Sequence, residues 1–142
     1  MKATAVLVDD KNYRPSEDEE FMNERQREYF KKKLLNWKEE ILQESRETLS
    51  HLQTETENHP DLVDRASSET DRALELRTRD RQRKLISKID EALRRIEDGS
   101  YGYCEETGEP IGVGRLDARP TATLSLEAQE RHERQERVHR DE

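Results

Sequence analysis

The feature that most constrains this chain is a stripe of apolar and small side chains at helical spacing, between about residues 24 and 58. Its positions recur every three or four residues, which is typical of one buried face of a long helix. They are Phe30, Leu34, Trp37, Ile41, Ser45, Thr48 and Leu52. Pro60 cannot continue a helix and biases His59 toward extended backbone, so the first helix is expected to end there.

A second periodic segment runs from about Asp61 to Glu97. Its predicted inner face comprises Ala66, Thr70, Ala73, Leu74, Leu85, Ile89, Leu93 and Ile96. The stretch "RTRDRQRK", residues 77–84, holds no apolar residue, so the packing there must be thin. Two helices of roughly 35 residues are each ~50 Å long, and a short connection forces them antiparallel. The sequence therefore predicts a mainly α protein built on a coiled-coil hairpin over residues 24–97, with its tip at 57–66.

The segments on either side of this hairpin differ from it. Residues 1–23 are predicted to be irregular, since Pro15 breaks them. Residues 98–124 contain all five glycines of the chain and two of its four prolines, which predicts a compact module of turns and short extended pieces. Residues 125–142 return to helix, with Ser125 as the predicted N-cap and Glu127 in the first turn.

Charge and composition exclude several classes of protein. Only 30% of the residues are hydrophobic and 42% are charged, too few apolar groups for a large round core. The net charge of −8 argues against direct DNA binding through phosphate neutralisation. The N-terminal apolar run of about six residues is too short for a membrane span or a secretory signal. The single cysteine allows no intramolecular disulfide. These features predict a soluble cytoplasmic protein.

The glycine-rich segment carries part of a metal motif. The stretch "YGYCEETGEPIG", residues 101–112, has the form of the first knuckle of a zinc ribbon, in which paired thiolates hold one tetrahedral ion. With Cys104 at the first ligand position, the other three positions fall on Thr107, Ser125 and Ala128. Thr and Ser hydroxyls stay protonated at neutral pH and Ala has no donor, so the sequence predicts no zinc and no other cofactor.

Packing is then expected to take the place of the metal. His132 and His139 are alternative ligands, but they are expected to be solvated helix residues. On this hypothesis Cys104 is an inert buried residue rather than a ligand. The predicted miniature core comprises Tyr101, Tyr103, Ile111, Val113, Leu116, Leu124 and Leu126.

Together, these features resemble the DksA family of bacterial transcription regulators. The resemblance covers nearly the whole chain, and its most specific part is "RRIEDGSYGYCEETGEPIGVGRLDARPTATL". The other parts are "PSEDEEFMNERQREYFKKKLLNWKEEIL", "HPDLVDRAS" and "LELRTRDRQRKLISKI". Typical members have four cysteines at the zinc site, so the chain resembles a cysteine-poor, zinc-independent branch of that family.

The resemblance implies a protein that binds bacterial RNA polymerase through its secondary channel, the pore by which nucleotides reach the active site. With guanosine tetraphosphate, such proteins alter open-complex stability, repressing ribosomal RNA promoters and activating some biosynthetic ones. A monomer is expected. The implied site residues are Asp61, Asp64 and Ala66 at the tip, Arg81 at the polymerase rim, and Leu85, Lys88 and Arg119 at the nucleotide site. Gln129 stands at a position that is basic in typical members.

Other roles remain open for the same residues. Asp61 beside Pro60 is a natural N-cap, and Asp64 stabilises the positive end of the second helix. Lys88 suits a solvated helix position, and Arg119 a clamp on the preceding turn. For the whole protein, the alternatives are a Gre-type transcript-cleavage factor, whose tip acids hold a second Mg²⁺, and a plain coiled-coil adaptor. No catalytic residue is predicted, because the four histidines are scattered without base–nucleophile spacing.

Overall fold

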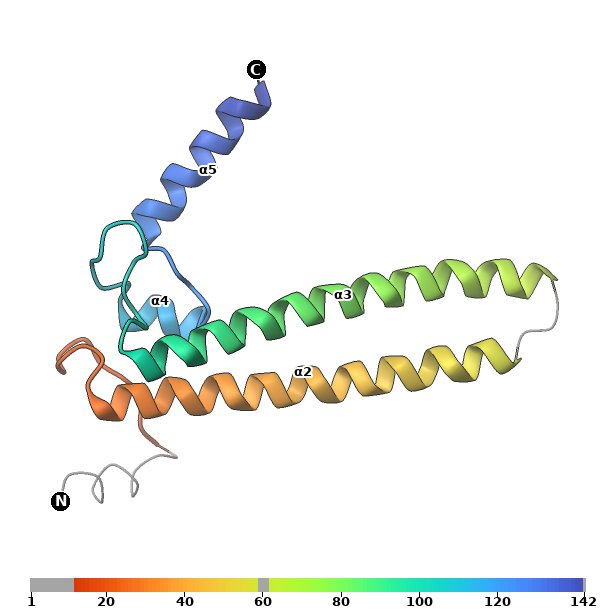
Figure 1. Cartoon of the computed structure of the whole chain (residues 1–142), viewed down its shortest axis with the longest axis horizontal. Helices are drawn as coiled ribbons and strands as arrows, with labels where there is room; N and C mark the ends of the chain where they lie inside the picture. Colours follow the sequence, from red (N-terminus) through yellow and green to blue (C-terminus); the bar gives the residue numbers. More distant parts are fainter. Residues whose placement is uncertain (1–11, 59–61, 142) are drawn as a thin grey trace. The chain divides into compact units, whose positions relative to one another are not determined.

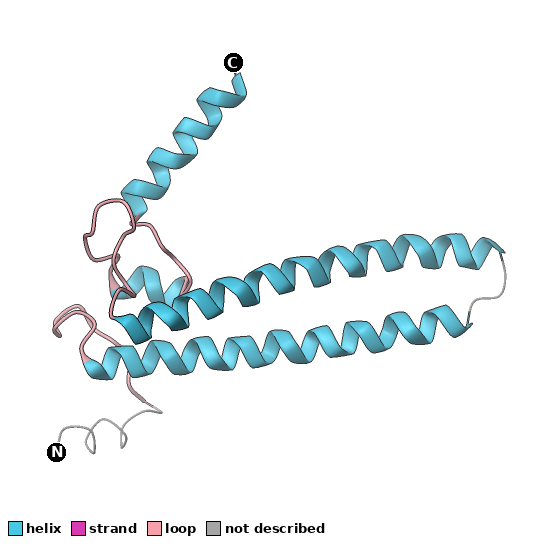
Figure 2. Cartoon of the chain, in the orientation of Figure 1, coloured by secondary structure: helices cyan, strands magenta, loops and turns pink. Residues whose placement is uncertain are grey.

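The computed structural model describes residues 12–58 and 62–141, without the side chains of residues 52, 55–58, 62–68, 140 and 141. In chain order its helices are α2 (Glu24–Asn58), α3 (Leu62–Asp98), α4 (Val113–Ala118) and α5 (Leu126–Asp141). Loops and turns connect α3, α4 and α5 (Figure 2). The predicted mainly α fold is confirmed, but the prediction of turns and extended pieces for residues 98–124 missed α4. No helix within the described ranges is long and apolar enough to cross a membrane.

The chain divides into two compact units. We call residues 35–90 the hairpin unit and residues 12–34 with 91–141 the terminal unit. In the hairpin unit, α2 and α3 lie side by side (Figure 1). The helices are joined from Lys38 Nζ to Asp90 Oδ1 at 2.7 Å, from Ser45 Oγ to Gln82 Oε1 at 2.8 Å, and from His51 Nδ1 to Glu75 Oε1 at 2.8 Å. Because the partner's number falls along α3 as it rises along α2, the pair is antiparallel, which confirms the coiled-coil hairpin.

The seam of the hairpin unit contains few apolar groups. Among the side chains described there, only Ile41 and Ile89 are buried, at 4% and 0% exposure. Glu75 and Gln82, which follow the same seven-residue interval as Ile89, contact α2 through polar atoms. The thin apolar packing predicted for residues 77–84 therefore begins earlier on α3, at Glu75.

Three predicted inner positions of α3 are wrong, because Thr70, Ala73 and Leu74 are exposed. The prediction assigned the nearest apolar side chain to the seam, whereas α3 turns the adjacent Glu75 toward α2. Leu74 is 53% exposed as a result.

The terminal unit holds the larger core. The rings of Phe30 and Tyr101 lie 5.7 Å apart and are 0% and 2% exposed. Tyr101 also donates a buried hydrogen bond to the carbonyl of Pro120 at 2.8 Å. The other buried apolar residues of this unit are Met22, Leu34, Ala92, Ile96, Cys104, Val113, Leu116, Ala122 and Ala128.

Two members of the predicted miniature core lie outside it. Tyr103 is 37% exposed and Leu126 is 59% exposed. Leu126 is the first residue of α5, and Ala128 takes the buried position on that helix at 0% exposure. Tyr103 instead packs edge-on against Phe21, with ring centroids 5.4 Å apart.

Residues 12–23, predicted to be irregular, form turns that pack against this core. The fully buried side chain of Gln26 links two points of the segment. Its Oε1 accepts a hydrogen bond from Met22 N at 2.7 Å, and its Nε2 donates to Ser16 O at 3.2 Å. The bond to Met22 accompanies a left-handed backbone at that residue, with φ of 54°. Gln26 therefore satisfies backbone groups that a buried turn would otherwise leave unpaired.

The substitution Gly102→Ala should destabilise the protein. Gly102 has a φ of 93°, and an added Cβ would lie 3.1 Å from the side chains of Phe21 and Met22. Strained backbone and overpacking together should lower the free energy of unfolding by ~1–3 kcal/mol, which urea denaturation measures. The control is Gly114→Ala in α4, where an added Cβ meets nothing within 4 Å. Equal stabilities of the two variants would contradict the described packing of residues 12–23.

Candidate functional site

The knuckle-like segment forms a closed turn around the single cysteine. Gly108 N donates to Cys104 O at 2.9 Å, and Cys104 N donates to Glu109 O at 2.8 Å. Gly108 adopts a φ of 75°, a left-handed conformation that favours glycine. The turn that the zinc-ribbon motif predicted is therefore present around Cys104, in the first half of the motif.

The second half of the motif lies at the start of α5. Ser125 Oγ accepts a hydrogen bond from Ala128 N at 3.2 Å, which confirms Ser125 as the N-cap. Glu105 N donates to Thr123 O at 2.9 Å and joins the two segments. Hydrogen bonds thus bring together the parts of the chain that hold the four ligand positions of the motif.

Cys104 lies at the meeting point of these segments and is 3% exposed. Burial raises the pKa of its thiol, but hydrogen bonds from the backbone of Ser125, from the hydroxyl and backbone of Thr107 and from the backbone of Glu106 outweigh burial. They lower the pKa to about 6. The prediction that Cys104 is buried is confirmed, and the prediction that it is inert stays a prediction. The hydrogen-bond donors around its sulfur favour the thiolate form.

The two histidines considered as alternative ligands do not join Cys104. His132 is half-buried, and its Nε2 lies 2.5 Å from Glu106 Oε1. Arg131 Nη2 lies 3.5 Å from the other oxygen of the same carboxylate. His139 is exposed near the end of α5. Within residues 12–58 and 62–141, no group of three or more His, Cys, Asp or Glu side chains is placed to hold a metal ion.

The residues implied at the tip are only partly described. Asp61 lies outside the described residues. Asp64 and Ala66 lie on the backbone of α3, close to its start at Leu62, and their side chains are not described. The rim residue Arg81 is exposed on α3, and its Nη2 donates to Thr78 Oγ1 at 3.3 Å.

The residues implied at the nucleotide site fall in both units. Leu85 and Lys88 belong to the hairpin unit, where Leu85 is half-buried and Lys88 is exposed. Their separation of three residues places them on one side of α3. Arg119 belongs to the terminal unit and is exposed. Gln129 is half-buried on α5, and its Nε2 donates to Glu133 Oε1 at 3.3 Å.

The backbone around Arg119 is held by hydrogen bonds on both sides. Arg119 N donates to Arg115 O at 2.7 Å and ends α4, while Ala122 N donates to Arg119 O at 3.0 Å. The backbone N–H of Arg119, rather than its guanidinium, therefore makes the hydrogen bond to the preceding turn. Its side chain is left exposed.

Sequence reasoning missed three residues next to this segment. Tyr29 Oη and Lys33 Nζ each donate to Asp117 Oδ1 at 2.6 Å. Tyr29 and Lys33 share a face of α2, four residues apart, but both lie more than 80 positions from Asp117. No local sequence signal could have paired them.

Comparisons with known proteins identify what the chain is similar to. Residues 26–96 match the family model "DnaK suppressor protein DksA, N-terminal domain", and residues 99–134 match "Prokaryotic dksA/traR C4-type zinc finger". The chain is 82% identical over 141 residues to the RNA polymerase-binding transcription factor DksA of Caulobacter vibrioides (strain NA1000 / CB15N), covering 99% of each. It is 47% identical over 115 residues to that of Escherichia coli (strain K12), covering 81% of this chain and 76% of the relative.

A solved structure has the same fold. The structure of transcription factor DksA2 from Pseudomonas aeruginosa aligns with a TM-score of 0.79 and 39% sequence identity. The alignment covers 96% of this chain and 99% of the other.

The match of residues 99–134 contradicts the prediction of a protein without zinc. The matching family is a C4-type zinc finger, which points to zinc binding. The prediction relied on counting thiols at Cys104, Thr107, Ser125 and Ala128, whereas the turns of the segment retain the zinc-finger pattern. The side chains at these four positions do not form a four-thiolate set, so no ligand set is assigned to this chain.

The thiolate of Cys104 should form with a midpoint near pH 6 in the folded protein and near ~8.5 in urea. The group's folded pKa is depressed, so its contribution to stability is complete above the unfolded pKa and is lost as pH falls through about 6. The measurements are the ultraviolet absorbance of the thiolate and urea denaturation between these pH values. Cys104→Ser gives the background. The parent should gain stability over Cys104→Ser as pH rises through this window, and a constant difference would contradict the thiolate assignment.

Proposed function

Since the chain belongs to the DksA family of RNA polymerase-binding transcription factors, we propose that it inserts its hairpin into the secondary channel of bacterial RNA polymerase. There it alters open-complex stability in response to guanosine tetraphosphate, repressing ribosomal RNA promoters and activating some biosynthetic ones. The observation that carries this proposal is the antiparallel α2–α3 pair. Helices of 35 and 37 residues make a rod ~50 Å long at 1.5 Å per residue, long enough to reach into a channel.

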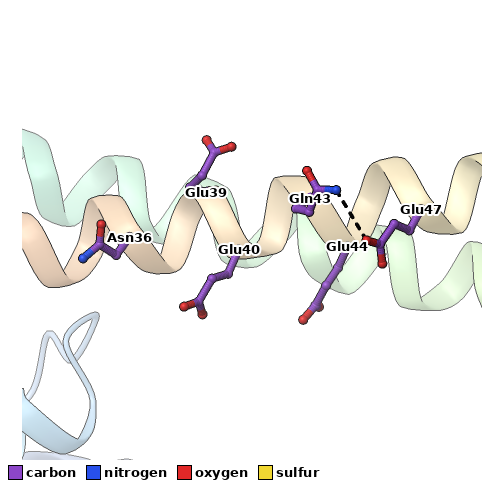
Figure 3. A pocket seen from close by; sticks show the side chains of 6 residues that line it. All are labelled: Asn36, Glu39, Glu40, Gln43, Glu44 and Glu47. Atoms are coloured by element: carbon purple, nitrogen blue, oxygen red, sulfur yellow. Dashed lines mark hydrogen bonds between the residues drawn. The ribbon is translucent and has the colours of Figure 1, made fainter.

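The outer faces of the hairpin unit support a protein channel as the environment of this rod. On α2, the side chains of Asn36, Glu39, Glu40, Gln43, Glu44 and Glu47 line a surface pocket (Figure 3). On α3, exposed basic side chains recur at helical spacing at Arg77, Arg81, Lys84 and Lys88. A rod with acidic residues on one helix and basic residues on the other suits a protein surface of mixed charge better than a DNA backbone.

The tip residues are proposed to act on the polymerase active site. Asp61 and Asp64 would place negative charge at the end of the rod, and Ala66 would allow close approach to the polymerase. Arg81 is proposed to contact the channel rim, where its guanidinium can bind carboxylates. The match to DksA models over both segments favours this function over a Gre-type cleavage factor or a plain adaptor.

The nucleotide is proposed to bind between this protein and the polymerase. Lys88 and Arg119 are exposed cations that suit a ligand with several phosphate charges through charge-assisted hydrogen bonds. Leu85 would supply an apolar contact beside Lys88. We propose that the protein acts as a monomer and in the cytoplasm, where bacterial RNA polymerase works.

Transcription in vitro from a ribosomal promoter, with bacterial RNA polymerase, tests the main proposal. The protein should repress this promoter, and guanosine tetraphosphate should strengthen the repression. A protein that leaves transcription unchanged with and without the nucleotide would contradict the proposed function. Cleavage of backtracked RNA in the same system would favour the Gre-type alternative.

The double substitution Asp61→Asn, Asp64→Asn should separate binding from regulation. Asn caps a helix about as well as Asp, so stability and polymerase binding should stay near parental values while promoter repression falls sharply. Ala66→Thr should also reduce repression. Asp71→Asn, at an exposed position further along α3, is the matched control. Parental repression by the double variant would refute the proposed role of the tip.

The substitutions Lys88→Ala and Arg119→Ala should each weaken the response to the nucleotide. Each removes charge-assisted hydrogen bonds of ~1.5–3 kcal/mol, so the nucleotide concentration for half-maximal effect should rise about tenfold or more. Lys31→Ala is the control, because this lysine pairs with Glu97 at 3.7 Å. If both variants respond as the parent does, the proposed nucleotide site is wrong.

A further inference from the structure

Asp117 is the penultimate residue of α4, and it accepts three hydrogen bonds from side chains of α2. Its Oδ1 accepts from Tyr29 Oη and from Lys33 Nζ, each at 2.6 Å. Its main-chain carbonyl accepts a third bond from Lys33 Nζ at 2.8 Å. The ammonium group of Lys33 therefore binds both the side chain and the backbone of Asp117. These two bonds restrain the position of the backbone as well as that of the carboxylate.

Asp117 stays a carboxylate and Tyr29 stays a neutral phenol over the physiological pH range. Burial raises the pKa of Asp117, but the hydrogen bonds from Lys33 and Tyr29 and the charge of Lys33 outweigh burial and hold it below its ordinary value. Burial and the bond to Asp117 raise the pKa of Tyr29 to about 12. A carboxylate and a neutral phenol therefore face Lys33 Nζ, and we call the cluster of Tyr29, Lys33 and Asp117 the brace.

Asp117, the member of the brace on α4, lies two residues before Arg119. Beyond Arg119, the carbonyl of Pro120 accepts the buried hydrogen bond from Tyr101 Oη at 2.8 Å. The segment is therefore anchored at Asp117 on one side and at Pro120 on the other. Between these anchors, the side chains of Ala118 and Arg119 are exposed.

We infer that Tyr29, Lys33 and Asp117 are positioning residues that present Arg119 to the nucleotide. This inference rests on the proposed function, in which Arg119 binds guanosine tetraphosphate. Aligning a guanidinium with a phosphate depends on where the backbone holds it, and small displacements weaken such bonds. The side chains of Lys33 and Asp117 are 37% and 32% exposed, and ion pairs this accessible contribute little to stability. Their loss should affect nucleotide response more than folding.

The substitution Lys33→Met tests this inference in transcription assays with bacterial RNA polymerase and guanosine tetraphosphate. The nucleotide concentration for half-maximal effect should rise about three- to tenfold, in the range expected for loss of one or two hydrogen bonds. Lys33→Arg, which keeps the charge and the donors, should restore part of the response. Lys31→Met removes the same charge two residues away, from a lysine paired with Glu97, and should respond like the parent.

A double-mutant cycle separates positioning from a general loss of structure. If Lys33 acts through Arg119, the variant Lys33→Met, Arg119→Ala should be no worse than Arg119→Ala alone. Multiplication of the two single effects would overturn the inference, because Lys33 would then act independently of Arg119. Thermal unfolding of each variant checks folding. Tyr29→Phe, which keeps the ring and removes one bond, gives a milder second test, with a smaller rise expected in the same assay.

The same set distinguishes failure of the inference from failure of the proposed function. A parental response from Arg119→Ala would remove the proposed nucleotide site, and the positioning role with it. A lost response from Arg119→Ala, with parental responses from Lys33→Met and Asp117→Asn, would leave the site in place and overturn the positioning role.

Discussion

The seam between α2 and α3 is the constraint on which the hairpin unit depends. Most of the stability of a helix in a protein comes from tertiary packing, yet only Ile41 and Ile89 are buried among the side chains described in this unit. The pairs Lys38–Asp90, Ser45–Gln82 and His51–Glu75 that also join the helices are polar and contribute ~1 kcal/mol or less each. One is imperfect, because Glu75 Oε2 is buried without a hydrogen-bond partner in the described part of the chain. Such a seam fixes register more than it adds stability, which suits the proposed insertion of the hairpin into a channel.

The terminal unit, unlike the hairpin unit, is stabilised by a core of buried side chains. Its core is small but contains fully buried aromatic and aliphatic groups, and Tyr29 packs edge-on against Phe30 with centroids 5.1 Å apart. The same tyrosine extends its hydroxyl to Asp117. One residue therefore connects the apolar core to the polar brace beside Arg119. Because of this coupling, core packing and the proposed nucleotide response can be tested on one short segment.

The periodicity of the sequence predicted the two long helices. It did not predict the polar contacts between residues that are far apart in the chain. Helical spacing and Pro60 were sufficient for the hairpin, since both act locally. The inward position of Glu75 was missed because its cross-helix partner, not its hydropathy, stabilises it. Asp117 was missed because its partners Tyr29 and Lys33 lie more than 80 positions away. Gln26 was missed for another reason, since it satisfies nearby backbone groups of a turn that has no helical periodicity. For Lys88 and Arg119, the proposed nucleotide contacts, residue type alone predicted the charge, whereas the way the backbone at Arg119 is held depends on contacts from distant parts of the chain.

The error over zinc arose because two separate properties were treated as one. A metal site needs donor side chains, and the hydrogen bonds around those ligands orient and tune them. Counting cysteines tests only the first property. Amides from Ser125, Thr107 and Glu106 lower the pKa of Cys104 to about 6, which supplies the second. Zinc binds the thiolate form of cysteine, so this segment keeps one property of the family's metal site while Thr107, Ser125 and Ala128 supply no further thiolate. The zinc-finger match is therefore consistent with the backbone of this segment, even though the chain has a single thiol.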